Sequence, residues 1–275
     1  SFDASSWKKL SNQKGSNPGG MYEAPDGKKY YVKFAKSNHH AANEILGAKL
    51  LEAAGGGTLT YHQLDLGGGK KGVATEWSDK QLFDFGNPGH LKEAWTNFGP
   101  NAWIANWDVI GEGTGEAMNQ ALVAGKMTTM DTGGGLEFRA QGAPKGAAFG
   151  TKVGEFDTLR SKTPNPNNGK VFGAMTASDI WASVEPVSKV TDQQIHALVD
   201  KYGHGDQAAK DALAQKLIAR RDDLTAQAKA LLGEAPAKPE PKPEPKAEPA
   251  PEPAPAAAAG APKPSELLQQ KASTN

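Results

Sequence analysis

Three charged residues have the types and local settings that phosphate chemistry requires. Lys33 lies in the apolar run YYVKF, Asp108 follows the apolar segment WIAN, and Asp131 is followed by glycines in MDTGGG. A lysine that points from a strand into a cleft can neutralise phosphate charge, and a carboxylate that ends a strand before glycines can reach a divalent cation. A second carboxylate can orient a hydroxyl or accept its proton. The ordinary alternatives are an edge-strand lysine that faces water and aspartates that form turns or cap helices.

The residues around these three indicate the same chemistry. GSNPGG lies directly before a predicted strand, and backbone N–H groups of such a turn can cradle phosphate oxygens, although an ordinary turn is the alternative. Glu44 lies in the helix predicted after the strand of Lys33, where its carboxylate can pair with the lysine or face solvent. Asn119 lies between the two aspartates, so the whole series follows the order that phosphoryl transfer uses. The candidate phosphate-binding residues of the turn are Gly15, Ser16, Asn17, Gly19 and Gly20.

The elements that must position these residues are strands in the first half and helices near the end. Alternating apolar residues around a Pro-Asp-Gly turn predict a hairpin over 21–34, and a second hairpin follows over 59–77 with a glycine-rich tip. Between them, residues 42–56 read as an amphipathic helix that ends in glycines. A helix and a loop are predicted over 92–110, and two short strands before Asp131. Capping signals at Thr191 and Asp206 predict two further helices, the last ending near Gly233.

This pattern resembles the atypical kinases, the group that holds the HipA-type toxin kinases, the actin-fragmin kinase and the phosphoinositide kinases. Their catalytic loop reads Asn-x-Asp, and ANWD at 105–108 matches that form. The stretch GSNPGGMYEAPDGKKYYVKF, with ANEILGAKLLEAAG after it, also resembles kinase-like modules of bacteriophage-encoded and bacterial multidomain proteins. The resemblance covers about residues 15–190. It implies an α+β, two-lobed protein-kinase-like fold with ATP bound between the lobes.

The resemblance also implies a role for each candidate residue. Asp108 is then the catalytic aspartate, and Lys33 binds the ATP phosphates together with the glycine-rich turn. Glu44 braces Lys33, while Asp131 and Asn119 hold Mg²⁺. The implied cofactors are therefore ATP and Mg²⁺.

The chain departs from the family pattern in the catalytic loop. No basic residue follows directly after Asp108, and DTG replaces the DFG of many kinases. The segment DVIGEGTGEAMN is long, which leaves Asn106 as the alternative metal ligand to Asn119. Arg139 and Lys145 follow in the place of an activation segment, where they contact phosphate or substrate, or are simply loop charges.

Composition sets the domain boundaries and excludes several classes of protein. We expect a first lobe over 1–78, a second over 79–233, and a disordered Pro/Ala/Lys/Glu tail over 234–275. The tail is expected to be disordered because its sequence offers almost no bulky apolar residues.

The chain has 31 basic and 31 acidic residues, which gives no reason to expect nucleic-acid or membrane binding. Disulfides and thiol catalysis are excluded because cysteine is absent. No secretion signal or membrane-spanning run is visible, so we expect a cytoplasmic, virion-associated or injected protein.

Three functions remain open from the sequence. The leading one is an ATP- and Mg²⁺-dependent phosphotransferase that acts on a protein hydroxyl, with the nucleotide and a protein substrate as partners. The second is a catalytically weak nucleotide-binding module within a larger phage or effector protein. The third is an AMP-transferring kinase-like enzyme.

Overall fold

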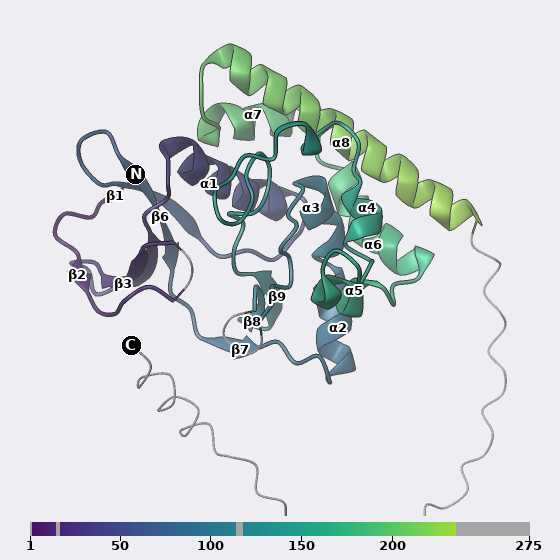
Figure 1. Ribbon diagram of the computed structural model, residues 1–275, viewed down its shortest axis with the longest axis horizontal. Coiled ribbons are helices and arrows are strands. Elements are labelled where there is room, and N and C mark those ends of the chain that lie inside the picture. The colour runs from purple at the N-terminus through teal and green to yellow at the C-terminus, as the bar shows by residue number, and fades with distance from the viewer. Residues whose placement is uncertain (1, 15–16, 114–117, 235–275) are drawn as a thin grey trace, which may run out of the picture. The chain divides into compact units, whose positions relative to one another are not determined.

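Figure 1 shows the computed structural model, which describes residues 2–14, 17–113 and 118–234. The predicted tail lies almost wholly outside these residues, because the last of them is Glu234 at the end of a helix. The described part combines strands and helices in two lobes, so the predicted α+β, two-lobed class is confirmed.

The first lobe is a six-stranded sheet with one helix against it. The sheet has the order β1-β5-β6-β4-β3-β2, with β1 parallel to β5 and every other pair antiparallel. Its elements are β1 (Phe2–Asp3), β2 (Lys8–Lys9), β3 (Gly19–Glu23), β4 (Lys29–Lys33), α1 (Asn38–Ala53), β5 (Tyr61–Asp65) and β6 (Lys71–Glu76).

The β3–β4 hairpin forms as its sequence predicts, and its register matters for the site. In the turn, the N–H of Gly27 donates to the carbonyl of Ala24. The register pairs Gly19 with Lys33, so the glycine end of β3 lies beside the lysine. The second hairpin, β5–β6, also has its predicted glycine-rich tip.

Helix α1 covers one face of this sheet and carries Glu44. It begins at Asn38, four residues earlier than the predicted start at 42, because the Ser37 side chain caps it by accepting from the N–H of His40. Apolar residues of α1 pack against strands β5 and β6, namely Ala41, Ile45 and Ala48 against Tyr61 and Val73.

The second lobe is mostly helical, with a small antiparallel sheet of order β7-β8-β9. Its core includes the fully buried Trp103, Phe98 and Phe172. The two predicted strands before Asp131 are present as β8 and β9. The elements are β7 (Lys80–Leu82), α2 (Pro88–Trp95), α3 (Phe98–Trp103), β8 (Gln120–Val123), β9 (Lys126–Thr129), a short 3₁₀ helix (Gly146–Ala148), α4 (Glu155–Thr158), α5 (Pro166–Phe172), α6 (Ala177–Ser188), α7 (Asp192–Tyr202) and α8 (Gln207–Glu234).

The last two helices follow their predicted capping signals. Thr191 and Gln194 form a reciprocal capping box at the start of α7. Before α8, the Asp206 carboxylate accepts from the N–H of Ala209. Helix α8 then runs to Glu234, one residue beyond the predicted stop at Gly233.

The connection between the lobes is short. Strand β6 ends at Glu76 and β7 begins at Lys80, and the boundary expected after residue 78, which lies in this connection, stays a prediction. In Figure 1 strands β1, β2, β3 and β6 lie on the left and helices α2 to α6 on the right. Among the described residues, no helix has both the length and the apolar character needed to cross a membrane.

Gly19 provides a direct test of the strand packing. Its backbone has a φ of 155°, and a Cβ built there would lie 1.9 Å from the carbonyl oxygen of Val32. Gly19→Ala must therefore push β3 away from β4, and we expect it to lower the free energy of unfolding by about 2 kcal/mol. Gly154→Ala is the control, because a Cβ there meets nothing within 4 Å. We expect that control to change stability by less than about 0.5 kcal/mol. Equal costs in urea unfolding would contradict the strand geometry.

Candidate active site

A half-buried lysine between two carboxylates forms the centre of the candidate site. Lys33 ends strand β4, Glu44 lies on α1, and Asp131 follows β9 in the second lobe. The Nζ atom of Lys33 lies 2.9 Å from Oε1 of Glu44 and 2.8 Å from Oδ2 of Asp131. The predicted Lys33–Glu44 ion pair is confirmed, and Asp131 joins it from the other lobe.

Burial and charge together set the protonation of this cluster. Burial alone would lower the pKa of Lys33, but the adjacent Asp131 and Glu44 carboxylates raise that pKa well above its ordinary value. Burial also opposes ionisation of Asp131, yet the Lys33 ammonium holds the pKa of this carboxyl below its ordinary value. Lysine and aspartate are therefore both charged at neutral pH. For Glu44, burial raises the pKa against the opposing effect of Lys33.

The glycines after Asp131 fix where its carboxylate points. The N–H of Gly133 donates to Oδ1 of Asp131 at 2.8 Å, while Oδ2 faces Lys33. A Cβ on Gly133 would lie 3.1 Å from Oδ1 of Asp131 and 3.2 Å from Oε2 of Glu44. The Thr132 hydroxyl donates to the carbonyl of Glu44 at 2.8 Å and thereby ties this turn to α1. DTGG is thus a compact turn that sets Asp131 against the first lobe.

Asp108 and Asn119 form a second pair close to this cluster. The Asn119 amide donates to the carbonyl of Asp108 at 2.7 Å and to its carboxylate Oδ2 at 3.0 Å. Burial raises the pKa of Asp108; the Asn119 bond opposes this rise, and the negative charge of Asp131 adds to it. A carboxylate with a raised pKa is a better proton acceptor, as a catalytic base requires.

The alternative metal ligand, Asn106, is occupied by internal bonds. It is fully buried, and its amide donates to Oδ1 of Asn101 at 2.9 Å. Its own Oδ1 accepts from the N–H of Asp108 at 3.3 Å. Asn106 therefore shapes the loop before Asp108, whereas the partly exposed Asn119 faces open space.

Two clefts meet at Asn119. The first cleft has a volume of about 280 Å³ and contains Lys33 and Asp131 in its wall; we term it the nucleotide cleft after the ligand that the resemblance implies. The second has a volume of about 910 Å³ and contains Asp108 and Arg139; we term it the acceptor cleft after the role that the resemblance implies for Asp108. Asn119 lines both. The two aspartates thus open onto different clefts, with one asparagine at the shared wall.

The glycine-rich turn is placed differently from the prediction. Gly15 and Ser16 lie outside the described residues, and Asn17 is half-buried with no hydrogen-bond partner for its Oδ1 among those described. Gly19 and Gly20 belong to strand β3 instead of the turn. Neither lines the nucleotide cleft. Close packing requires glycine in this strand, since a Cβ on Gly20 would lie 2.1 Å from the carbonyl oxygen of Ser11. Contact of the turn with phosphate stays a prediction.

Two basic residues after Asp131 have distinct environments. Arg139 is exposed and lines the acceptor cleft. Lys145, in contrast, is buried, and its ammonium donates to the carbonyls of Ala105 and Gly134. The burial lowers the pKa of Lys145 to about 7. The interpretation of Lys145 as a loop charge is therefore wrong. The burial of Lys145 was not predicted, because the sequence around this residue gives no sign of it.

The donor set suits Mg²⁺ in the presence of a nucleotide. The described residues contain no group of three or more His, Cys, Asp or Glu side chains placed to hold a metal ion. Mg²⁺ is commonly bound through one or two carboxylates together with substrate phosphates and water, so a dedicated protein cage is not needed. Asp131 and Asn119 both line the nucleotide cleft, and their side-chain oxygens fit that pattern.

Comparison with known proteins identifies the fold. No family model matches the sequence, and no curated protein matches it. The crystal structure of the Helicobacter pylori proinflammatory kinase CtkA superposes with a TM-score of 0.55 at 13% identity, over 84% of this chain and 99% of that chain. The chain has a protein-kinase-like fold. This kinase-like fold is the one that the resemblance to atypical kinases implied.

Two further solved structures are similar at lower TM-scores. An aminoglycoside phosphotransferase from Alicyclobacillus acidocaldarius has a TM-score of 0.32 at 11% identity, over 82% of this chain and 92% of that chain. HipA in the Shewanella oneidensis toxin–antitoxin complex has a TM-score of 0.38 at 13% identity, over 82% of this chain and 66% of that chain.

Proposed function

We propose that this chain is an ATP- and Mg²⁺-dependent phosphotransferase that acts on a protein hydroxyl. One observation carries the proposal. Lys33 is held between Glu44 and Asp131 in the wall of the nucleotide cleft, and Asn119 lines both this cleft and the acceptor cleft that contains Asp108. A kinase-like fold with these four acidic and basic side chains has the parts that phosphoryl transfer uses.

The nucleotide cleft has an apolar part and a charged part. Leu59, Val73, Met118 and Met130 line it, and they suit the flat apolar faces of adenine. Lys33 lies in the same wall, so its ammonium would neutralise phosphate charge once a nucleotide binds. Glu44 is buried and hydrogen-bonded to Lys33 at 2.9 Å, which keeps the lysine in place.

Asp131 and Asn119 would hold Mg²⁺ with the phosphates. The ion would neutralise charge on the phosphate oxygens. Because Asn119 also bonds to Asp108, the group that holds the metal and the group that meets the acceptor are linked by direct contact.

Asp108 would act on the acceptor hydroxyl. The acceptor oxygen forms a bond to the terminal phosphorus, the bond from that phosphorus to the ADP oxygen breaks, and the hydroxyl proton moves to the Asp108 carboxylate. The acceptor cleft, at about 910 Å³, has room for a segment of polypeptide that carries a serine, threonine or tyrosine hydroxyl. This volume accommodates a protein acceptor.

A nucleotide-binding module without transfer activity is the second candidate. The residue directly after Asp108 is the fully buried Val109, so the loop lacks the adjacent basic side chain that many kinases use. The same feature leaves AMP transfer as a third outcome to be tested.

The experiment is incubation of the full chain with ATP, Mg²⁺ and a generic protein acceptor, followed by intact-mass spectrometry and an assay for ADP release. Phosphate on either protein supports the proposal, whereas ADP release without protein-bound phosphate shows ATP hydrolysis alone. An AMP adduct replaces it with nucleotidyl transfer. Absence of both products, with Mg·ATP bound, replaces it with the nucleotide-binding module.

A further inference from the structure

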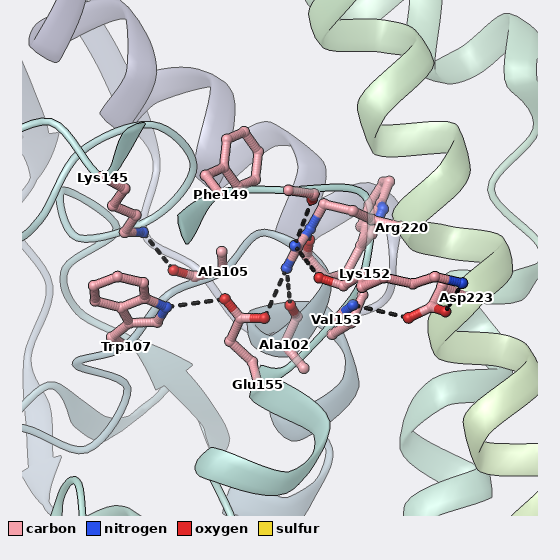
Figure 2. A network of polar contacts seen from close by, with 12 residues as sticks. Ala102, Ala105, Trp107, Lys145, Phe149, Lys152, Val153, Glu155, Arg220 and Asp223 are labelled. Carbon is pink, nitrogen blue, oxygen red and sulfur yellow. Dashed lines mark hydrogen bonds and ion pairs between the residues drawn. The ribbon is translucent and has the colours of Figure 1, made fainter. Parts of the chain in front are cut away.

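Trp107, the residue before Asp108, is held by a buried network that reaches α8. Its indole N–H donates to Oε1 of Glu155 at 2.9 Å, and Oε2 of Glu155 accepts from Nη2 of Arg220 at 3.1 Å. Figure 2 shows these bonds in one view, with Glu155 between the tryptophan and the arginine. The Glu155 carboxylate thus links the loop that carries Asp108 to helix α8.

Every N–H group of the Arg220 guanidinium donates a hydrogen bond. Its side chain is fully buried, and it donates to the carbonyls of Trp103 and Ala102 as well as to Glu155. The remaining N–H groups donate to the carbonyls of Gly150 and Lys152 at 3.0 Å. Because a guanidinium has five N–H donors in a rigid fork, these bonds leave it one orientation. Glu155 is therefore held in one position too.

The Trp107 ring is also contacted by cations. Nζ of Lys145 lies 4.7 Å from the ring centroid, and Cζ of Arg139 lies 5.3 Å from it. Lys145 in turn donates to the carbonyl of Ala105, which has a left-handed φ of 55° that is uncommon outside glycine. The loop from Ala105 to Asp108 is thus held at two points, by the bond to the Ala105 carbonyl and by the contacts of the Trp107 indole.

We propose that Trp107 is a positioning residue for Asp108: the Glu155 carboxylate, oriented by Arg220, fixes the indole and with it the loop that presents Asp108 to the acceptor cleft. The expected change in kcat rests on the proposed phosphotransferase activity. The expected change in the mobility of the loop does not, because it can be measured without turnover.

Trp107→Phe removes the indole hydrogen bond, and because Trp107 also lines the acceptor cleft, hydrogen exchange is the readout that reports the loop itself. Phenylalanine keeps an aromatic face for Lys145 and Arg139, and Glu155 keeps its bond to Arg220. Trp95→Phe is a matched control, since Trp95 is also half-buried and its indole N–H donates at 2.7 Å to the carbonyl of Val171. Trp95 lines neither the nucleotide cleft nor the acceptor cleft.

We expect Trp107→Phe to lower kcat about tenfold while the Kd for Mg·ATP stays within about twofold, as for a residue that matters mainly in the transition state. Hydrogen exchange should become faster for the backbone amides of residues 106–110. Trp95→Phe should change neither quantity. Unchanged exchange in Trp107→Phe, or equal effects in the two variants, would overturn the proposal. So would a Trp107→Phe protein that no longer folds, because the bond would then serve folding in general.

The exchange measurement separates this proposal from the proposed function. If the wild-type chain shows no turnover, the phosphotransferase assignment fails, and the exchange comparison alone decides the role of Trp107. If turnover is present and exchange is unchanged, the assignment stands and the positioning role is wrong.

Discussion

Asp108→Asn should lower ATP turnover at least about 100-fold, a barrier increase of roughly 3 kcal/mol, while Mg·ATP still binds. The carboxylate lines the acceptor cleft and is absent from the wall of the nucleotide cleft, so its loss removes the proton acceptor and leaves the phosphate contacts in place. Asparagine keeps an oxygen that can accept from Asn119. Turnover is measured by ADP release and binding by calorimetric titration.

Glu112→Gln is the matched control for this change. Glu112 is a second acidic residue of the acceptor cleft and is exposed. We expect its neutral variant to keep turnover within about threefold of wild type, as for a side chain without a transition-state contact. Full activity in Asp108→Asn would exclude Asp108 as the catalytic residue. Equal losses in the two variants would show that the effect is one of cleft charge alone.

Asp131→Asn should weaken Mg·ATP binding at least about 30-fold, roughly 2 kcal/mol. Its carboxylate is the acidic group beside Lys33 in the nucleotide cleft, and an amide is a poorer ligand for a hard cation. Binding of ATP without Mg²⁺ should fall much less, because removing a negative charge near Lys33 favours the phosphates. The dependence on Mg²⁺ is therefore the diagnostic quantity, measured by titration with and without the ion.

Glu76→Gln serves as the control in the same cleft. Glu76 also lines the nucleotide cleft, but its carboxylate faces His62 at 3.3 Å instead of Lys33. We expect its variant to bind Mg·ATP within about threefold of wild type. The assignment of Asp131 to the metal is wrong if Asp131→Asn and Glu76→Gln weaken binding equally, or if the loss in Asp131→Asn is the same without Mg²⁺.

Local signals predicted much of the fold. Hairpin β3–β4 follows from a Pro-Asp-Gly turn between alternating residues, and α7 follows from the Thr191 capping box, because both need only neighbours in sequence. The start of α1 was missed, since the Ser37 cap lies ahead of the apolar stripe that marked the helix. The close strand packing at Gly19 was not predicted, because a glycine pattern does not distinguish close ligand approach from close strand packing.

The site was partly predictable for a related reason. Lys33 and Glu44 are 11 residues apart on adjacent elements, so their order along the chain suggested the pair. Glu155 and Arg220 are 65 residues apart, and Arg220 lies among charged residues of a long helix, where it reads as a solvated side chain. A contact of this kind depends on how α8 packs on the domain, which local patterns do not encode.

Calorimetric titration of the wild-type chain and of Lys33→Met tests most directly whether the cleft between the lobes binds Mg·ATP through Lys33. Lys33 lies in the wall of this cleft between both carboxylates, so its ammonium is the charge to which we assign phosphate binding in the proposal. We predict one binding site for ATP in the wild type, tighter with Mg²⁺ than without it, and at least about tenfold weaker binding in Lys33→Met, roughly 1.4 kcal/mol. Absence of ATP binding to the folded wild type, or equal affinity in Lys33→Met, would contradict this prediction.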